Sequence, residues 1–106
     1  MDGETPRIVI ENAGSGRSAA KAGYFATLVI AEPAHLCSAQ WATREICRAL
    51  GFNESGVYHA VIAVTEFAHK ELIDAGSGKL HLTAIRVRGR LALEAKAELD
   101  RAAAYA

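Results

Sequence analysis

The sequence predicts a two-layer α/β sandwich, in which two helices cover one face of a mostly antiparallel sheet in the order β-β-α-α-β-β. Three observations support this fold class. Two short runs rich in β-branched residues come first, two segments with apolar residues at three- and four-residue spacing follow, and two alternating runs around a tight turn complete the pattern. The 106 residues suffice for a single domain, 1–106, whose limited core is compatible with pairing to another subunit.

The first two strands are predicted at residues 7–11, R-I-V-I-E, and 26–31, A-T-L-V-I-A. The intervening residues 12–23 are small and polar, which predicts a flexible connection or a weak helix. Glu32-Pro33 should end the second strand, because proline restricts the residue before it and withholds a backbone donor.

Two amphipathic helices are predicted at about 34–50 and 54–75. Gly51 is the expected stop of the first helix, and Asn53 is the expected cap of the second. The apolar stripes that should face the core are formed by Leu36, Ala39, Gln40, Ala42, Thr43, Ile46, Cys47 and Leu50 in the first helix and by Val57, Val61, Val64, Ala68, Leu72 and Ala75 in the second. Trp41 either fills the core or lies on an exposed helix face as an anchor for a partner.

The remaining residues predict a β-hairpin and a tail, 99–106, with high helix propensity. Strands at 79–87 and 91–98 flank a tight turn at 88–90, R-G-R. The hairpin should have one solvent-exposed face. We expect Leu80, Leu82, Ala84, Ile85, Leu91, Leu93, Ala95 and Ala97 to point inward, and Glu94, Lys96 and Glu98 to point outward.

Composition and charge exclude several classes of function. Twelve basic and twelve acidic residues give zero formal net charge, so nothing favours binding to nucleic acid or to an anionic membrane. No apolar run approaches the roughly 18 residues of a membrane span, and the acidic N-terminus M-D-G-E-T-P does not resemble a signal peptide. We therefore expect a cytoplasmic protein that contacts neither membrane nor nucleic acid.

Cysteine and histidine spacing predicts neither a disulfide nor a metal site. Cys37 and Cys47 fall in one predicted helix, where ten intervening steps of ~1.5 Å separate their backbones by roughly 15 Å, too far for a bond within the chain. We expect both thiols to be reduced and to have a buried structural role. The histidines at 35, 59, 69 and 81 form no pair at ligand spacing, so we expect scattered solvent-facing or capping side chains and no bound metal.

Four passages of the chain resemble a known family: A-L-G-F at 49–52, A-V-T-E-F-A-H-K at 63–70, D-A-G-S-G-K-L at 74–80 and the hairpin that follows. The run from about Thr27 to Glu98 is similar to the N-terminal half of the GHKL (histidine-kinase-like) ATPase domain. The nearest likeness is to the anti-sigma-factor and switch-protein serine kinases of bacterial stress signalling. The resemblance implies a truncated Bergerat-like fold.

The same resemblance divides the chain into an N-terminal extension, 1–26, a GHKL-like half domain, 27–98, and the tail, 99–106. The extension contains the possible strand at 7–11.

The resemblance also implies that the chain has lost the nucleotide site. In that family the second helix carries an E-x-x-x-N motif, whose glutamate orients water or assists proton transfer and whose asparagine ligates Mg²⁺. Glu66 matches the glutamate, but Lys70 stands at the asparagine position, and a charged lysine has no acceptor to offer a cation. The family's D-x-G-x-G motif falls near residues 96–100, where Lys96 stands about where the aspartate should be and no glycine follows Gly89. We therefore regard Glu66, Lys70 and Lys96 as vestigial positions and expect no cofactor, ATP included.

Three interpretations of Glu66 and Lys70 remain open. They form a surface ion pair at i,i+4 spacing, or the Lys70 ammonium replaces Mg²⁺ and neutralises Glu66 in an emptied pocket, or they act as a catalytic pair.

Three hypotheses of function follow. The leading one is a non-catalytic regulatory module for protein-protein interaction, which binds a protein partner or forms a homodimer through an open sheet edge or apolar patch. The second is an ATP-binding serine kinase of the anti-sigma type, or a fragment of one. The third is an unrelated small α/β domain. The geometric test of the third is whether the two helices lie side by side on one sheet face with Glu66 pointing into a cleft.

Overall fold

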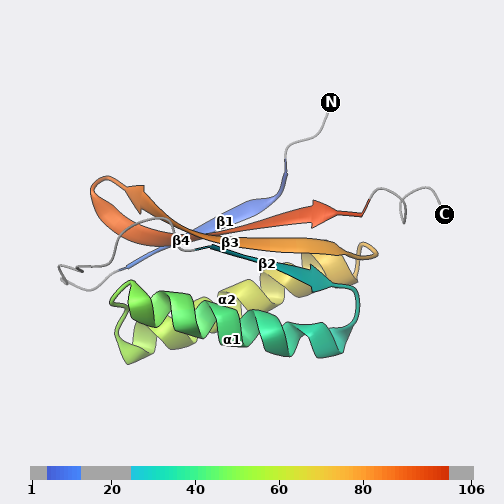
Figure 1. Ribbon diagram of the computed structural model, residues 1–106, viewed down its shortest axis with the longest axis horizontal. Helices are drawn as coiled ribbons and strands as arrows, with labels where there is room; N and C mark the ends of the chain where they lie inside the picture. The colour runs from blue at the N-terminus through green and yellow to red at the C-terminus, as the bar shows by residue number, and fades with distance from the viewer. Residues whose placement is uncertain (1–4, 13–24, 101–106) are drawn as a thin grey trace.

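The computed structural model describes residues 5–12 and 25–100, which form a four-stranded antiparallel sheet with two helices on one face (Figure 1). The elements are β1 (Arg7–Glu11), β2 (Phe25–Ile30), α1 (Leu36–Ala49), α2 (Glu54–Ala68), β3 (Gly78–Val87) and β4 (Arg90–Leu99). The strand order is β1-β4-β3-β2, so the first two strands of the chain form opposite edges of the sheet. The predicted fold class and element order are confirmed. The connection expected at 12–23 and the tail lie mostly outside the described residues.

Local sequence signals start and stop both helices. A 3₁₀ turn, Pro33–His35, leads into α1, and Nδ1 of His35 accepts the Ala31 N–H at 3.0 Å. Gly51 ends α1 with φ of 87°, a left-handed conformation that glycine adopts without steric cost. Asn53 caps α2 as predicted, because its Oδ1 accepts the Gly56 N–H at 2.7 Å.

The second helix does not continue to residue 75 as an α-helix. After Ala68 it widens into a π-helical turn, His69–Ile73, in which the Asp74 N–H donates to the His69 carbonyl at 2.9 Å. The expected apolar stripe holds as far as Leu72, which is buried, whereas Ala75 is exposed beyond the end of the turn. The extra residue per turn shifts the helix face, so the simple 3.6-residue periodicity fails over its last part.

Glycine is required at both ends of the β3–β4 hairpin. Val87 pairs with Arg90, which leaves a two-residue turn, Arg88-Gly89, with positive φ at both positions, as in a type I′ hairpin turn. At the start of β3, a Cβ on Gly78 would lie 2.1 Å from the Glu98 carbonyl oxygen. Only glycine permits this close approach of the two strands.

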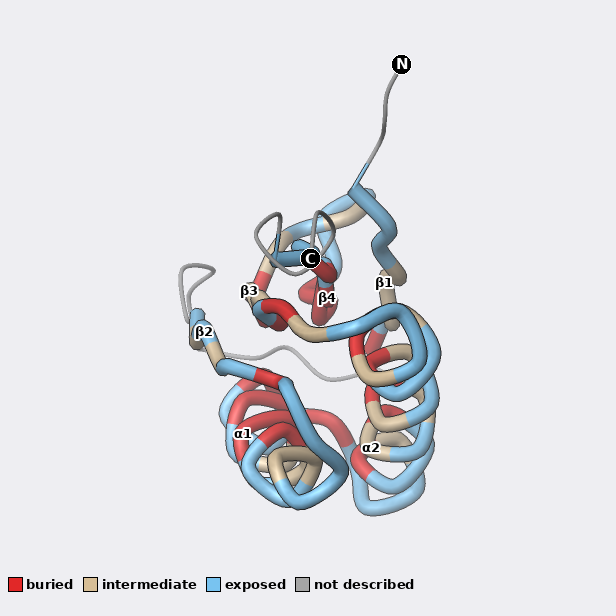
Figure 2. The backbone as a smooth tube through the Cα atoms, turned by 90° about the vertical axis from the view of Figure 1, so that its right-hand side faces the viewer, coloured by how far each residue is buried: buried red, intermediate tan, exposed pale blue. Residues whose placement is uncertain are grey.

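The core lies between the inner face of the sheet and the two helices, as the buried segments in Figure 2 show. Gln40 of α1 donates to the Thr65 hydroxyl of α2 at 3.3 Å, which ties the helices side by side. The fully buried larger side chains are Ile30, Thr43, Cys47, Leu50, Val64, Leu72, Leu80, Leu82 and Leu93. Seven of the hairpin residues predicted to point inward are buried. Ile85 is the exception, because it pairs with Ala92 on the face away from the helices and is only partly buried.

Candidate functional site: the open β2 edge

Glu66 and Lys70, the positions that the family resemblance singles out on the second helix, are both exposed to solvent. Glu66 lies in the regular part of α2, whereas Lys70 lies in the π-helical turn. Among the described residues no ion pair joins them, so the surface pair expected from their spacing is not formed.

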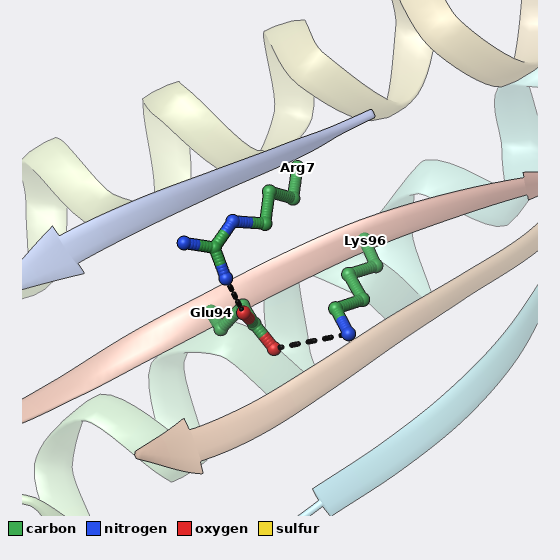
Figure 3. A network of polar contacts seen from close by, with 3 residues as sticks. All are labelled: Arg7, Glu94 and Lys96. Atoms are coloured by element: carbon green, nitrogen blue, oxygen red, sulfur yellow. Dashed lines mark hydrogen bonds and ion pairs between the residues drawn. The ribbon is translucent and has the colours of Figure 1, made fainter. Parts of the chain in front are cut away.

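Lys96 lies on the other side of the sheet, in a polar cluster that also contains Arg7 and Glu94 (Figure 3). In the sheet register Arg7 pairs with Lys96, and their side chains face away from the helices. The Lys96 ammonium is 3.8 Å from one Glu94 carboxylate oxygen, and the Arg7 guanidinium donates to the other. The structure therefore does not bring Lys96 together with Glu66 and Lys70.

The burial of Glu94 corrects the prediction that its face of the hairpin is fully solvent-exposed. Only 9% of its side chain is accessible, because Arg7 from the neighbouring strand β1 and Lys96 from its own strand close over it. A buried carboxylate is tolerated when such cations pair with it. Sequence alternation within the hairpin could not reveal this cover, since Arg7 lies 87 residues away in the chain.

The two cysteines also differ from one another. Cys47 is fully buried, as expected, and burial raises the pKa of its thiol from 9.0 to about 12. Cys37 is exposed, which corrects the expectation that both thiols are buried. Its place on the first turn of α1 puts it beside β2 rather than between helix and sheet.

The most unusual surface is the free edge of β2. Within the described residues no strand pairs with this edge. The strand, F-A-T-L-V-I, contains no charged residue and no proline. Phe25 and Val29 are 74% and 63% exposed on its outer face. An edge without charges, prolines or bulges is a template for pairing with another strand.

An apolar groove continues this edge onto the first helix. Its volume is about 480 Å³, and it is lined by Ala26, Leu28, Cys37, Ser38, Trp41 and Ala42. Trp41 is 63% exposed, which decides between the two roles that the sequence left open: it lies on the surface, not in the core. We define the β2 surface as β2 together with this groove.

A chain of hydrogen bonds holds the middle of β2 to the sheet. The Thr27 hydroxyl lies 3.1 Å from Nδ1 of His81, and Nε2 of His81 lies 2.8 Å from Glu98. These three side chains come from β2, β3 and β4, and the chain fixes the outer face of the edge strand to its neighbours. His81 therefore links three strands on the face of the sheet that points away from the helices.

The described part of the chain contains no group of three or more histidine, cysteine, aspartate or glutamate side chains placed to hold a metal ion. None of its helices has the length and apolar character needed to cross a bilayer.

Comparisons with known proteins found no match: no family model, no curated protein and no solved structure is similar to this chain at a significant level.

Proposed function

We propose that this protein is a non-catalytic interaction module that forms a homodimer by antiparallel pairing of β2 with β2 of a second copy. The observation that carries the proposal is the combination of an uncharged free edge with the large exposed apolar side chains of Phe25, Val29 and Trp41 around it. Burial of these side chains and of the unpaired strand edge would provide the driving force. The zero formal charge of the chain does not oppose self-association.

The sequence of β2 suits pairing with itself. Residues that face each other across an antiparallel pair must lie on the same side of the sheet. In a register centred on Thr27, Phe25 faces Val29 of the second copy, and Ala26 faces Leu28 of the second copy. The two-fold axis repeats both contacts, so each exposed apolar residue of the strand gains an apolar cross-strand partner. The groove and Trp41 lie beside the same axis, next to the groove of the second copy.

We further propose that this module is a degenerate relative of the anti-sigma-factor kinase ATPases, in which the nucleotide site is lost. The separation of Lys96 from Glu66 and Lys70 on opposite sides of the sheet supports the lack of a nucleotide site, since such a site would need those positions to converge. Titration with a fluorescent ATP analogue and Mg²⁺ should detect no binding tighter than about 1 mM, a standard free energy of ~4 kcal/mol. Tighter binding would restore the hypothesis of an ATP-dependent serine kinase.

The dimer is tested by Val29→Glu with size-exclusion chromatography and light scattering. We expect the wild-type chain to be dimeric at high micromolar concentration. The Kd of the dimer should rise at least about a hundredfold, because pairing would place a charged carboxylate against the apolar ring of Phe25 of the second copy. Since Val29 is 63% exposed, the substitution should leave the fold intact by circular dichroism.

Tyr58→Glu is the matched control, because Tyr58 is 65% exposed but lies on α2, away from the β2 surface. This variant should remain dimeric. A wild-type chain that is monomeric at high micromolar concentration would contradict the proposal.

A further inference from the structure

The tip of the β3–β4 hairpin concentrates positive charge. Arg86, Arg88 and Arg90 lie within five consecutive residues, and all three are exposed. Among the described residues, no ion pair involves any of them. The described hydrogen bonds give them a single side-chain link, from Arg86 Nη1 to the Gly89 carbonyl at 3.3 Å. A chain with no net charge thus presents, at the end of the molecule where Figure 1 shows the hairpin turn, three guanidinium groups that no carboxylate of the described residues neutralises.

The backbone at the tip is less favourable than the turn type requires. Arg88 has φ of 53°, in the left-handed region, where a side chain with a Cβ is strained and asparagine or glycine is preferred. The second turn position is Gly89, so asparagine at 88 would give the most favoured pair for this turn. Non-glycine residues in this strained region occur often at functional sites.

The register shows what kind of ligand the three side chains can reach. Arg86 pairs with Leu91 and faces the helix side of the sheet, whereas Arg90 pairs with Val87 and faces the opposite side. Arg88 lies between them at the turn. The guanidinium groups therefore spread around the tip and do not converge on one point. Such a spread fits an extended ligand with several anionic groups better than a single small ion.

We propose that the arginine hairpin, residues 86–90, binds an acidic polypeptide segment with closely spaced carboxylates. The planar guanidinium fork matches a carboxylate with two parallel hydrogen bonds, which a lysine ammonium cannot do. A nucleic acid is the less favoured ligand, because phosphate-backbone binding needs a broad basic surface and this chain has zero net charge. The site is independent of the β2 surface, since β2 and the hairpin turn share no residue.

The test uses a fluorescein-labelled peptide of alternating glutamate and serine, titrated with the full chain and followed by fluorescence anisotropy. The decisive variant is Arg88→Asn. It should bind the peptide roughly two- to fivefold more weakly, as expected for the loss of one exposed charge pair. It should also melt a few degrees higher, because asparagine relieves the turn. Weaker binding by a more stable protein cannot be attributed to unfolding.

Two further measurements make the outcome decisive. Lys79→Gln is the matched control, because it removes one exposed positive charge near the opposite end of β3 and should bind as the wild type does. Binding should also weaken as salt increases. The proposal is overturned if the peptide does not bind, if Arg88→Asn binds it unchanged, or if a labelled single-stranded oligonucleotide binds more tightly than the peptide.

Peptide binding by the arginine hairpin can be tested independently of dimer formation. Val29→Glu should bind the peptide with wild-type affinity even as a monomer, so either proposal can fail while the other stands.

Discussion

The two edges of the sheet differ in how they deal with unpaired backbone. On one edge, β1 carries Arg7 and Glu11 at its ends and follows Pro6, features that discourage pairing with another strand. On the other edge, β2 carries neither charge nor proline and presents Phe25 and Val29 to solvent. One protein therefore contains a protected edge and an unprotected one.

The exposure of β2 is therefore not a general property of a small sheet. The charged residue at the start of β1 also stabilises the fold, since the Arg7 guanidinium donates to the buried Glu94 carboxylate. No equivalent charge protects β2, whose middle is held by the neutral Thr27 hydroxyl. If β2 is a docking strand, its lack of charge is a requirement of the interface.

The largest expected effect is the formation of a disulfide-linked dimer, which tests the register of β2 pairing. With Thr27→Cys in a Cys37→Ser background, a pairing centred on residue 27 would place the two introduced thiols opposite each other. Their Cα atoms would then be about 4.5–5.5 Å apart, within the range of a disulfide. Mild oxidation should convert most of the protein to a covalent dimer on a non-reducing gel.

Val29→Cys in the same background is the control, since residue 29 would face Phe25 of the second copy. It should crosslink far less. Equal crosslinking of the two variants would rule out the register centred on Thr27, and no crosslinking of either would argue against strand pairing.

The second expected effect concerns the protected edge. Arg7→Ala should lower the free energy of unfolding by about 1–3 kcal/mol, because it leaves the buried Glu94 carboxylate with only the Lys96 ammonium at 3.8 Å. Urea denaturation followed by circular dichroism measures the difference. Glu11→Ala is the matched control on the same strand, since Glu11 is exposed and should change stability by no more than about 0.5 kcal/mol.

If both variants of β1 have the same free energy of unfolding, Arg7 does not stabilise this edge. The two edges would then differ in sequence but not in their contribution to stability.

The elements of the fold were predictable because their signals are local. The cap at Asn53, the stop at Gly51 and the alternation of the hairpin each depend on neighbours in sequence. Strand order was not predictable, because it depends on contacts between distant segments. The sequence contained the uncharged run of β2, but only the order β1-β4-β3-β2 identifies that run as a free edge.

The environments of several side chains could not be predicted for the same reason. The cover over Glu94 comes from Arg7, and the exposure of Cys37 and Trp41 depends on where α1 lies relative to β2. The separation of Lys96 from Glu66 depends on strand register and on the helices covering only one face. The family resemblance supplied candidate positions in the sequence, but only the structure shows how far apart they lie in space.

The smallest expected effect uses the native cysteines as reporters of the β2 surface. At pH 8 a thiol reagent should modify Cys37, which is exposed in the groove. It should spare Cys47, because a pKa of about 12 leaves about one thiol in ten thousand ionised at pH 8, and the side chain is fully buried. The modification rate of Cys37 should fall several-fold as protein concentration rises, since the second copy would cover the groove. In the Val29→Glu variant the rate should be independent of concentration. If the rate in the wild-type protein is also independent of protein concentration, no second copy covers the groove. The unprotected edge of β2 would then not be a site of association.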